Sequence, residues 1–150
     1  MTLHKSVAGR LATVAGLLAV MLTTFAASAW AAQRFSVASG TWVSTSTWSA
    51  TSGGASGATA PVAGDDAIIE GGFTVTLDAA KTATTVTVRS GSTLDAATFI
   101  MTVSGTFTLQ SGSTFKQGGT TTGVPGLIRS FDVNSTYIYY GGQTSITGIG

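Results

Sequence analysis

Short runs of alternating apolar and polar residues dominate most of the chain. In residues 73–77, 86–88 and 107–109, Val, Leu or Phe alternates with Thr. Such period-two alternation with β-branched residues is typical of strands that bury one face. Before these runs, residues 49–64 are rich in Gly and Ser, which predicts a loop.

An internal repeat gives these strands a period. Residues 87–95 recur as residues 108–116, 21 positions later, with five of nine residues identical and apolar or polar character kept at the others. A period near ~20 residues is typical of solenoids, in which each repeat stacks on the next. Residues 73–77 also resemble residues 99–103 at an offset of 26, which predicts an insertion around residues 79–83 in the earlier coil.

The repeat predicts an all-β fold. We expect a right-handed parallel β-helix of about four coils over residues 65–150, after a cap and a loop over residues 32–64. Strands of successive coils would stack about 4.8 Å apart. The side chains expected to point inward are Val75, Val88, Leu94, Phe107, Leu109 and Phe115. A β-sandwich stays open as the alternative, because its strands also recur every ~8–12 residues.

Composition favours strands over helices. Thr, Ser and Gly make up 56 of the 119 residues after position 31, and charged residues only 9% of the whole chain. Thr favours strands, whereas Gly and Ser favour turns and weaken helices. This composition excludes a helix bundle, a Rossmann domain and a coiled coil.

The first 31 residues have the pattern of a secretory signal peptide. Positive residues precede an apolar run over residues 11–25, and small residues follow at 27–31. We expect cleavage after Ala31 and export to the extracellular space or the cell surface, with the periplasm as an alternative. No membrane span would then be left. An uncleaved anchor is the other alternative, since residues 11–33 carry no charge over a length that spans a bilayer.

The chain after residue 31 lacks two residue types that many enzymes use. It contains no His and no Cys, because the single His of the chain lies in the signal segment. Ser-His-Asp and Cys-His catalysis, metals ligated by His or Cys, and disulfides are thereby excluded from it. Its five Lys or Arg residues nearly balance six Asp or Glu residues, so no basic surface for nucleic acid is expected.

Several motifs match a known type of protein. Residues 47–49, Pro61, residues 63–69 and residues 73–78 resemble the opening of secreted bacterial repeat proteins, and residues 135–148 resemble their closing segment. These proteins are similar to haemagglutinin-like adhesins and to the domain named for its eight glycines. The resemblance implies a parallel β-helix displayed at, or released from, the cell surface, and it carries no catalytic residues. Relatives are usually longer, so we expect either a fragment or a short protein whose last coil needs a further cap.

Acidic residues cluster where the first of the expected strands begins. Asp65, Asp66 and Glu70 provide the oxygen ligands that calcium prefers, and calcium is the one cofactor that the sequence suggests. With Asp78 and a base such as Lys81 or Arg89, they also resemble the carboxylate cluster of a polysaccharide lyase. The alternative is a turn held by Asp side chains, because the Asp-x-Asp-x-Asp-Gly spacing of a calcium loop is missing.

Two further sets of side chains suggest ligand binding. Trp42, Trp48 and Tyr139 would stack on sugar rings if they were exposed on one face, with a plug in the first coil as the alternative for the tryptophans. Outward threonine pairs would offer ice a flat array of hydroxyl and methyl groups; the members of this array are Thr74, Thr76, Thr85, Thr87, Thr106 and Thr108. The alternative is that Thr is simply a good polar strand former.

These observations lead to three hypotheses about function. The first is an exported structural or adhesive β-solenoid without catalysis, whose lateral face binds a glycan or another cell-surface component. The second is the N-terminal part of a carbohydrate-active β-helix enzyme of the lyase or glycosidase type. The third is an ice-binding solenoid.

Overall fold

The computed structural model describes residues 31–119 and 125–141, which belong to one compact unit from Ala31 to Gly150. Residues 1–30 of the predicted signal peptide lie outside the described residues. The described segments form β-strands and one short 3₁₀ turn, and they contain no α-helix. The elements are β1 (Gln33–Ser36), β2 (Gly40–Thr41), η1 (Thr45–Thr47), β3 (Trp48–Ser49), β4 (Asp66–Ile69), β5 (Thr74–Thr76), β6 (Lys81–Ala83), β7 (Thr85–Val88), β8 (Thr93–Asp95), β9 (Met101–Val103), β10 (Thr106–Leu109), β11 (Thr114–Gln117), β12 (Ile128–Phe131) and β13 (Thr136–Tyr139).

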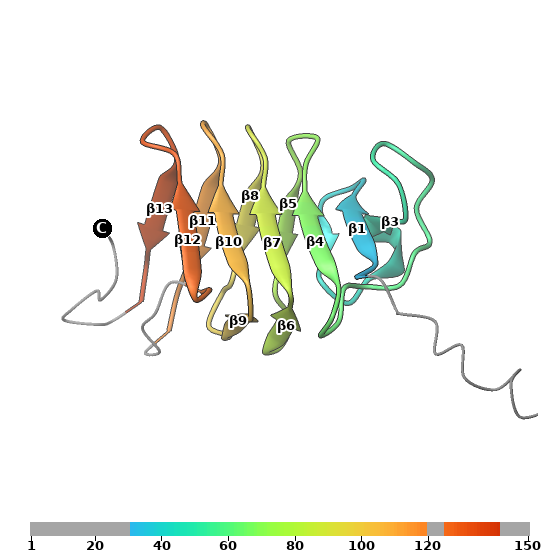
Figure 1. Cartoon of the computed structure of the whole chain (residues 1–150), viewed down its shortest axis with the longest axis horizontal. Helices are drawn as coiled ribbons and strands as arrows, with labels where there is room; N and C mark the ends of the chain where they lie inside the picture. The colour runs from blue at the N-terminus through green and yellow to red at the C-terminus, as the bar shows by residue number, and fades with distance from the viewer. Residues whose placement is uncertain (1–30, 120–124, 142–150) are drawn as a thin grey trace, which may run out of the picture. The chain divides into compact units, whose positions relative to one another are not determined.

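Strands of successive coils stack into three sheets (Figure 1). The first sheet has the order β12-β10-β7-β4-β1-β3, the second sheet has the order β13-β11-β8-β5-β2, and the third sheet pairs β6 with β9. All pairs between coils are parallel, and β3 alone among the described strands runs antiparallel to its partner, β1. The described chain is an all-β parallel β-solenoid of about three turns between residues 66 and 139.

This topology confirms the predicted parallel β-solenoid, with about three turns between residues 66 and 139 where the repeat predicted about four coils over residues 65–150. The β-sandwich alternative is wrong, because the strands from β4 to β13 pair in parallel with their equivalents in neighbouring coils instead of forming antiparallel hairpins. The right-handed sense of the coil stays a prediction. We call each first-sheet strand together with the second-sheet strand that follows it a rung, so that the four rungs after the cap are β4–β5, β7–β8, β10–β11 and β12–β13.

The register confirms the 21-residue repeat and corrects the second one. Thr87 pairs with Thr108 and Leu94 with Phe115, as the repeat predicts. The predicted match between residues 73–77 and 99–103 is wrong, because β5 pairs with β8 and β9 pairs with β6. Residues 81–83 are therefore a strand of the third sheet and not an insertion. Both segments alternate apolar and polar residues, and this alternation does not reveal to which sheet a strand belongs.

The interior consists of apolar columns that run along the stack. All six side chains predicted to point inward are at most 1% exposed, which confirms their placement. In the first sheet, for example, Ala67, Val86 and Phe107 occupy equivalent positions on three successive rungs. Full burial of a large apolar side chain stabilises the fold by about 1.5–3 kcal/mol, and these columns therefore provide much of the stability that a chain without disulfides needs.

Tight turns connect the first sheet to the second sheet, and we call each of them a first corner. In the second rung, the N–H of Ser92 donates to the carbonyl of Arg89 at 3.0 Å, which closes a four-residue turn. Its third residue, Gly91, has φ of +75°, and Gly72 and Gly112 have φ of +76° and +73° at the equivalent positions. Type II and type I′ turns both require positive φ at this position, which explains the glycines.

Candidate functional site

The two tryptophans close the N-terminal end of the solenoid. Trp42 and Trp48 are 1% and 0% exposed, and their rings meet edge to face with centroids 5.1 Å apart. The indole N–H of Trp42 donates to the carbonyl of Pro61 at 3.0 Å, and that of Trp48 donates to the carbonyl of Trp42 at 2.7 Å. This burial contradicts the prediction that they stack on sugars and agrees with the alternative, a plug in the first coil.

Tyr139 lies on the last described strand, β13. It pairs with Gln117, a buried residue, and is itself half-buried. Its hydroxyl donates to the carbonyl of Gly119 at 2.8 Å. Tyr139 thus continues the interior instead of standing on a lateral face, and the exposed aromatic side chain at this end is Tyr140.

The acidic residues at the start of the solenoid do not converge. A carboxylate oxygen of Asp65 accepts a hydrogen bond from the backbone N–H of Val62, and one of Asp66 accepts a hydrogen bond from the hydroxyl of Thr85 at 2.7 Å. Glu70 lies beyond the other end of β4. The described residues contain no group of three or more His, Cys, Asp or Glu placed to hold a metal ion. This geometry contradicts the predicted calcium site, and the Asp65 contact is that of a turn.

The carboxylates that the lyase hypothesis combines occupy different corners of one coil. Asp65 precedes β4, Glu70 follows β4, and Asp78 follows β5. Asp78 forms an ion pair with Lys81 at 2.8 Å, and the hydrogen bond from Lys81 lowers the pKa of the Asp78 carboxyl below its usual value. Glycoside hydrolysis requires two carboxyl groups that flank one bond, and these three residues do not provide such a pair.

The predicted threonine array is divided between two sheets. Thr85 and Thr87 on β7 lie beside Thr106 and Thr108 on β10 in the first sheet, whereas Thr74 and Thr76 lie on β5 in the second sheet. These pairs share the Thr-x-Thr pattern in the sequence, which does not reveal the sheet to which each strand belongs. The register shows that the six side chains do not form one face, which corrects this prediction.

A different threonine column runs along the outer face of the second sheet. Thr74, Thr93, Thr114 and Thr136 are partners on the four rungs, and we call them the Thr ladder. Among the described residues, none of these four hydroxyl groups has a hydrogen-bond partner. Of these four, the sequence prediction included only Thr74. Thr93, Thr114 and Thr136 were missed because Ser, Thr and Gly recur throughout the sequence. The signal that reveals them is their position, two residues after the third residue of each first-corner turn.

A second outward column follows the Thr ladder. It contains Thr76, Asp95 and Lys116 on the first three rungs. The hydroxyl of Tyr140 donates to a carboxylate oxygen of Asp95 at 2.6 Å. Burial, followed by this hydrogen bond and the charge of Asp95, raises the pKa of the Tyr140 phenol to about 12. This face therefore combines neutral hydroxyls with one acidic and one basic residue.

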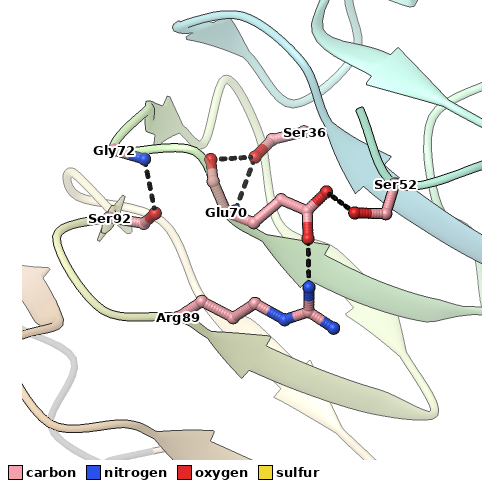
Figure 2. A network of polar contacts seen from close by, with 6 residues as sticks. All are labelled: Ser36, Ser52, Glu70, Gly72, Arg89 and Ser92. Atoms are coloured by element: carbon pink, nitrogen blue, oxygen red, sulfur yellow. Dashed lines mark hydrogen bonds and ion pairs between the residues drawn. The ribbon is translucent and has the colours of Figure 1, made fainter. Parts of the chain in front are cut away.

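A polar network surrounds Glu70 at the first corner of the first rung (Figure 2). The backbone N–H and carbonyl of Glu70 both bond to the hydroxyl of Ser36, at 2.8 and 3.0 Å. One carboxylate oxygen accepts a hydrogen bond from the hydroxyl of Ser52 at 2.6 Å, and the other pairs with the guanidinium of Arg89 on the next rung. The side chain of Glu70 is 10% exposed, whereas that of Arg89 is 44% exposed. An open pocket of about 260 Å³ adjoins this corner.

Comparison with known proteins identifies no family. A scan against protein-family models, a search of curated proteins and a search of solved structures each found no match to this chain. In the part of the chain that the structure describes, no helix has the length and apolar character to cross a membrane. Of the properties that the resemblance implies, the structure therefore supports the fold, a β-solenoid of about three turns.

Proposed function

We propose that the chain is an exported, non-catalytic β-solenoid that presents a lateral face to a glycan or another cell-surface component. The observation that carries this proposal is the Thr ladder, in which four hydroxyl groups stand in register on successive rungs. Adjacent rungs of a sheet lie about 4.8 Å apart. The ladder thus repeats hydroxyl groups at a regular spacing, which suits a partner that itself repeats, such as a polysaccharide chain.

The surroundings of the Thr ladder support a binding role. Its hydroxyls can both donate and accept hydrogen bonds, and Asp95 and Lys116 beside it add a charged acceptor and a charged donor. The interior columns beneath the second sheet include Leu94 and Phe115, which are 0% exposed. A face built on a packed core loses little conformational freedom when it binds, and preorganisation of this kind favours affinity.

The test is a pair of double variants on the two sheets. Thr93→Ala with Thr114→Ala removes the centre of the Thr ladder, while Thr87→Ala with Thr108→Ala removes an equally paired set from the first sheet. Both variants keep the core and should fold. We expect the exported protein to bind a glycan array or whole cells, the ladder variant to bind at least about tenfold more weakly, and the first-sheet variant to bind as before.

Three results would contradict the proposal. One is that the unmodified protein binds no glycan and no cell. Another is that both double variants bind like the unmodified protein. The third is thermal hysteresis that disappears with the Thr ladder, because it would assign this face to ice.

A further inference from the structure

The open pocket lies between three segments that are far apart in the sequence. Ser36 comes from the end of β1, Gly53 and Gly54 come from the loop before β4, and Glu70, Gly71 and Phe73 come from the first corner of the first rung. Its volume of about 260 Å³ is slightly below the ~300 Å³ at which pockets for drug-sized ligands begin. The pocket therefore has room for one small ring.

One wall of the pocket is formed by Glu70, whose carboxylate is held by residues outside the lining. Ser36 and Ser52 hold the backbone and the carboxylate of Glu70, and Arg89 neutralises its charge. A carboxylate oxygen that accepts one hydrogen bond keeps a further lone pair. The carboxylate of Glu70 can thus accept a further hydrogen bond from a ligand hydroxyl.

Another wall is aromatic. Phe73 is half-buried, and a Cβ atom at Gly71 would lie 2.6 Å from its ring. Glycine at this position, with φ of +72°, therefore lets the phenyl ring lie against the backbone of the corner. A Cβ atom at Gly53 would meet no heavy atom within 4 Å, so that the lining at Gly53 is open. An aromatic face next to hydrogen-bonding groups offers a ligand an apolar and a polar contact at once.

The charges of the pocket favour a neutral ligand. An anion would be repelled by the buried carboxylate of Glu70. A cation would be attracted by that carboxylate, but Arg89 already pairs with it. Leaving a buried charge without its partner is costly, so a ligand that displaced Arg89 would bind weakly. A neutral ring with several hydroxyl groups is not repelled by Glu70 and does not displace Arg89.

We propose that this pocket binds one neutral pyranose ring, with a hydroxyl on the carboxylate of Glu70 and the C–H face of the sugar on Phe73. The site differs from the Thr ladder in its residues and in its ligand, a single ring rather than a repeating chain. It gives the proposed function a second contact with carbohydrate that does not depend on the ladder.

The experiment is an NMR titration of the ¹⁵N-labelled exported protein with methyl glycosides of glucose, galactose, mannose and N-acetylglucosamine. We expect at least one glycoside to shift the amide signals of Gly53, Gly54 and Gly71 saturably, with a dissociation constant in the millimolar range. Phe73→Leu keeps an apolar side chain but removes the aromatic face, and it should weaken binding roughly five- to tenfold. Phe99→Leu is the matched control, since Phe99 is an exposed phenylalanine in another part of the solenoid.

Glu70→Gln provides an independent check, because it keeps the shape of the side chain and removes its charge. It should also weaken the binding of the same glycoside. The proposal is overturned if no glycoside shifts the pocket amides saturably, or if Phe73→Leu and Phe99→Leu bind equally well. Failure of the pocket is distinguishable from failure of the proposed function: a protein that binds the glycan array through the Thr ladder but shows no glycoside shifts would overturn the pocket alone.

Discussion

At the first coil, two indole rings close the interior of the solenoid, whereas at the last rung the interior ends in half-buried aromatic side chains. Trp42 and Trp48 are almost fully buried, and β3 runs antiparallel beside β1 as the outermost strand. At the other end, Phe131 and Tyr137 pack against Phe107 and Phe115, with ring centroids 5.7 and 5.5 Å apart. Within the described residues, no strand lies beyond β12 and β13.

The difference shows that closure of the stack is not a property of the repeat. The repeat makes every rung a template for the next one, and strand edges left bare invite association. The N-terminal end is closed by a segment outside the repeat, which turns back antiparallel and inserts two large side chains. Side chains that close an end should therefore contribute more to stability than equally large ones at the last rung.

The largest expected effect is the loss of an indole ring from the cap. Trp48→Ala should lower the free energy of unfolding by about 3–5 kcal/mol, because it leaves a cavity beneath Trp42. Tyr137→Ala at the last rung should cost less than half as much, since Tyr137 is only partly buried. Urea unfolding followed by tryptophan fluorescence and circular dichroism measures both values. Equal losses for the two variants would remove the distinction between the ends.

A smaller effect is expected at the first corners. Gly91 has φ of +75°, whereas Asn134 at the equivalent corner of the last rung does not have positive φ. Gly91→Ala should therefore lower the free energy of unfolding by about 1–2 kcal/mol, and Asn134→Ala by about 0.5 kcal/mol or less. Thermal unfolding of the two variants tests this order, and a larger loss for Asn134→Ala would contradict the described turn.

The smallest effect concerns the ionisation of the Tyr140 phenol, directly after the last described strand. In the folded chain the pKa of Tyr140 is raised from 10.0 to about 12, so its contribution to stability is complete below pH 10 and is lost as the pH rises through 12. Asp95→Asn should move this pKa back toward 10.0, because it removes the charge and weakens the hydrogen bond. Absorbance of the phenolate follows the titration, and Tyr140→Phe identifies its signal. A titration that Asp95→Asn leaves unchanged would disprove the contact.

The sequence predicted those features that depend on one apolar pattern. Inward residues such as Val88 and Leu109 are buried because alternation within a strand fixes which face they occupy, and the 21-residue repeat fixes the register of β7 with β10. The registers of the neighbouring rungs were harder to predict, because β4 and β7 are offset by 19 residues and β10 and β12 by 22 instead of 21. Corners of different length shift the period without changing the pattern of the strands.

The candidate site was harder to predict for two reasons. The Glu70 network joins residues from three segments, and no local pattern relates Ser36 or Ser52 to Arg89. The Thr ladder depends on register, and in a chain filled with Thr every strand offers a threonine. The burial of the tryptophans was also hard to predict, because it depends on contacts that the sequence does not reveal, such as that of Trp42 with Pro61.

The most direct test of this account is a measurement of the register of the Thr ladder. Couplings across hydrogen bonds, detected by long-range HNCO spectroscopy, identify the carbonyl that accepts each amide proton. We expect the N–H of Thr93, Thr114 and Thr136 to couple to the carbonyl carbons of Phe73, Ser92 and Ser113, to whose oxygens they donate at 2.9, 2.9 and 2.8 Å. Couplings to carbonyls one or two residues away would place other side chains on the outer face and contradict the Thr ladder.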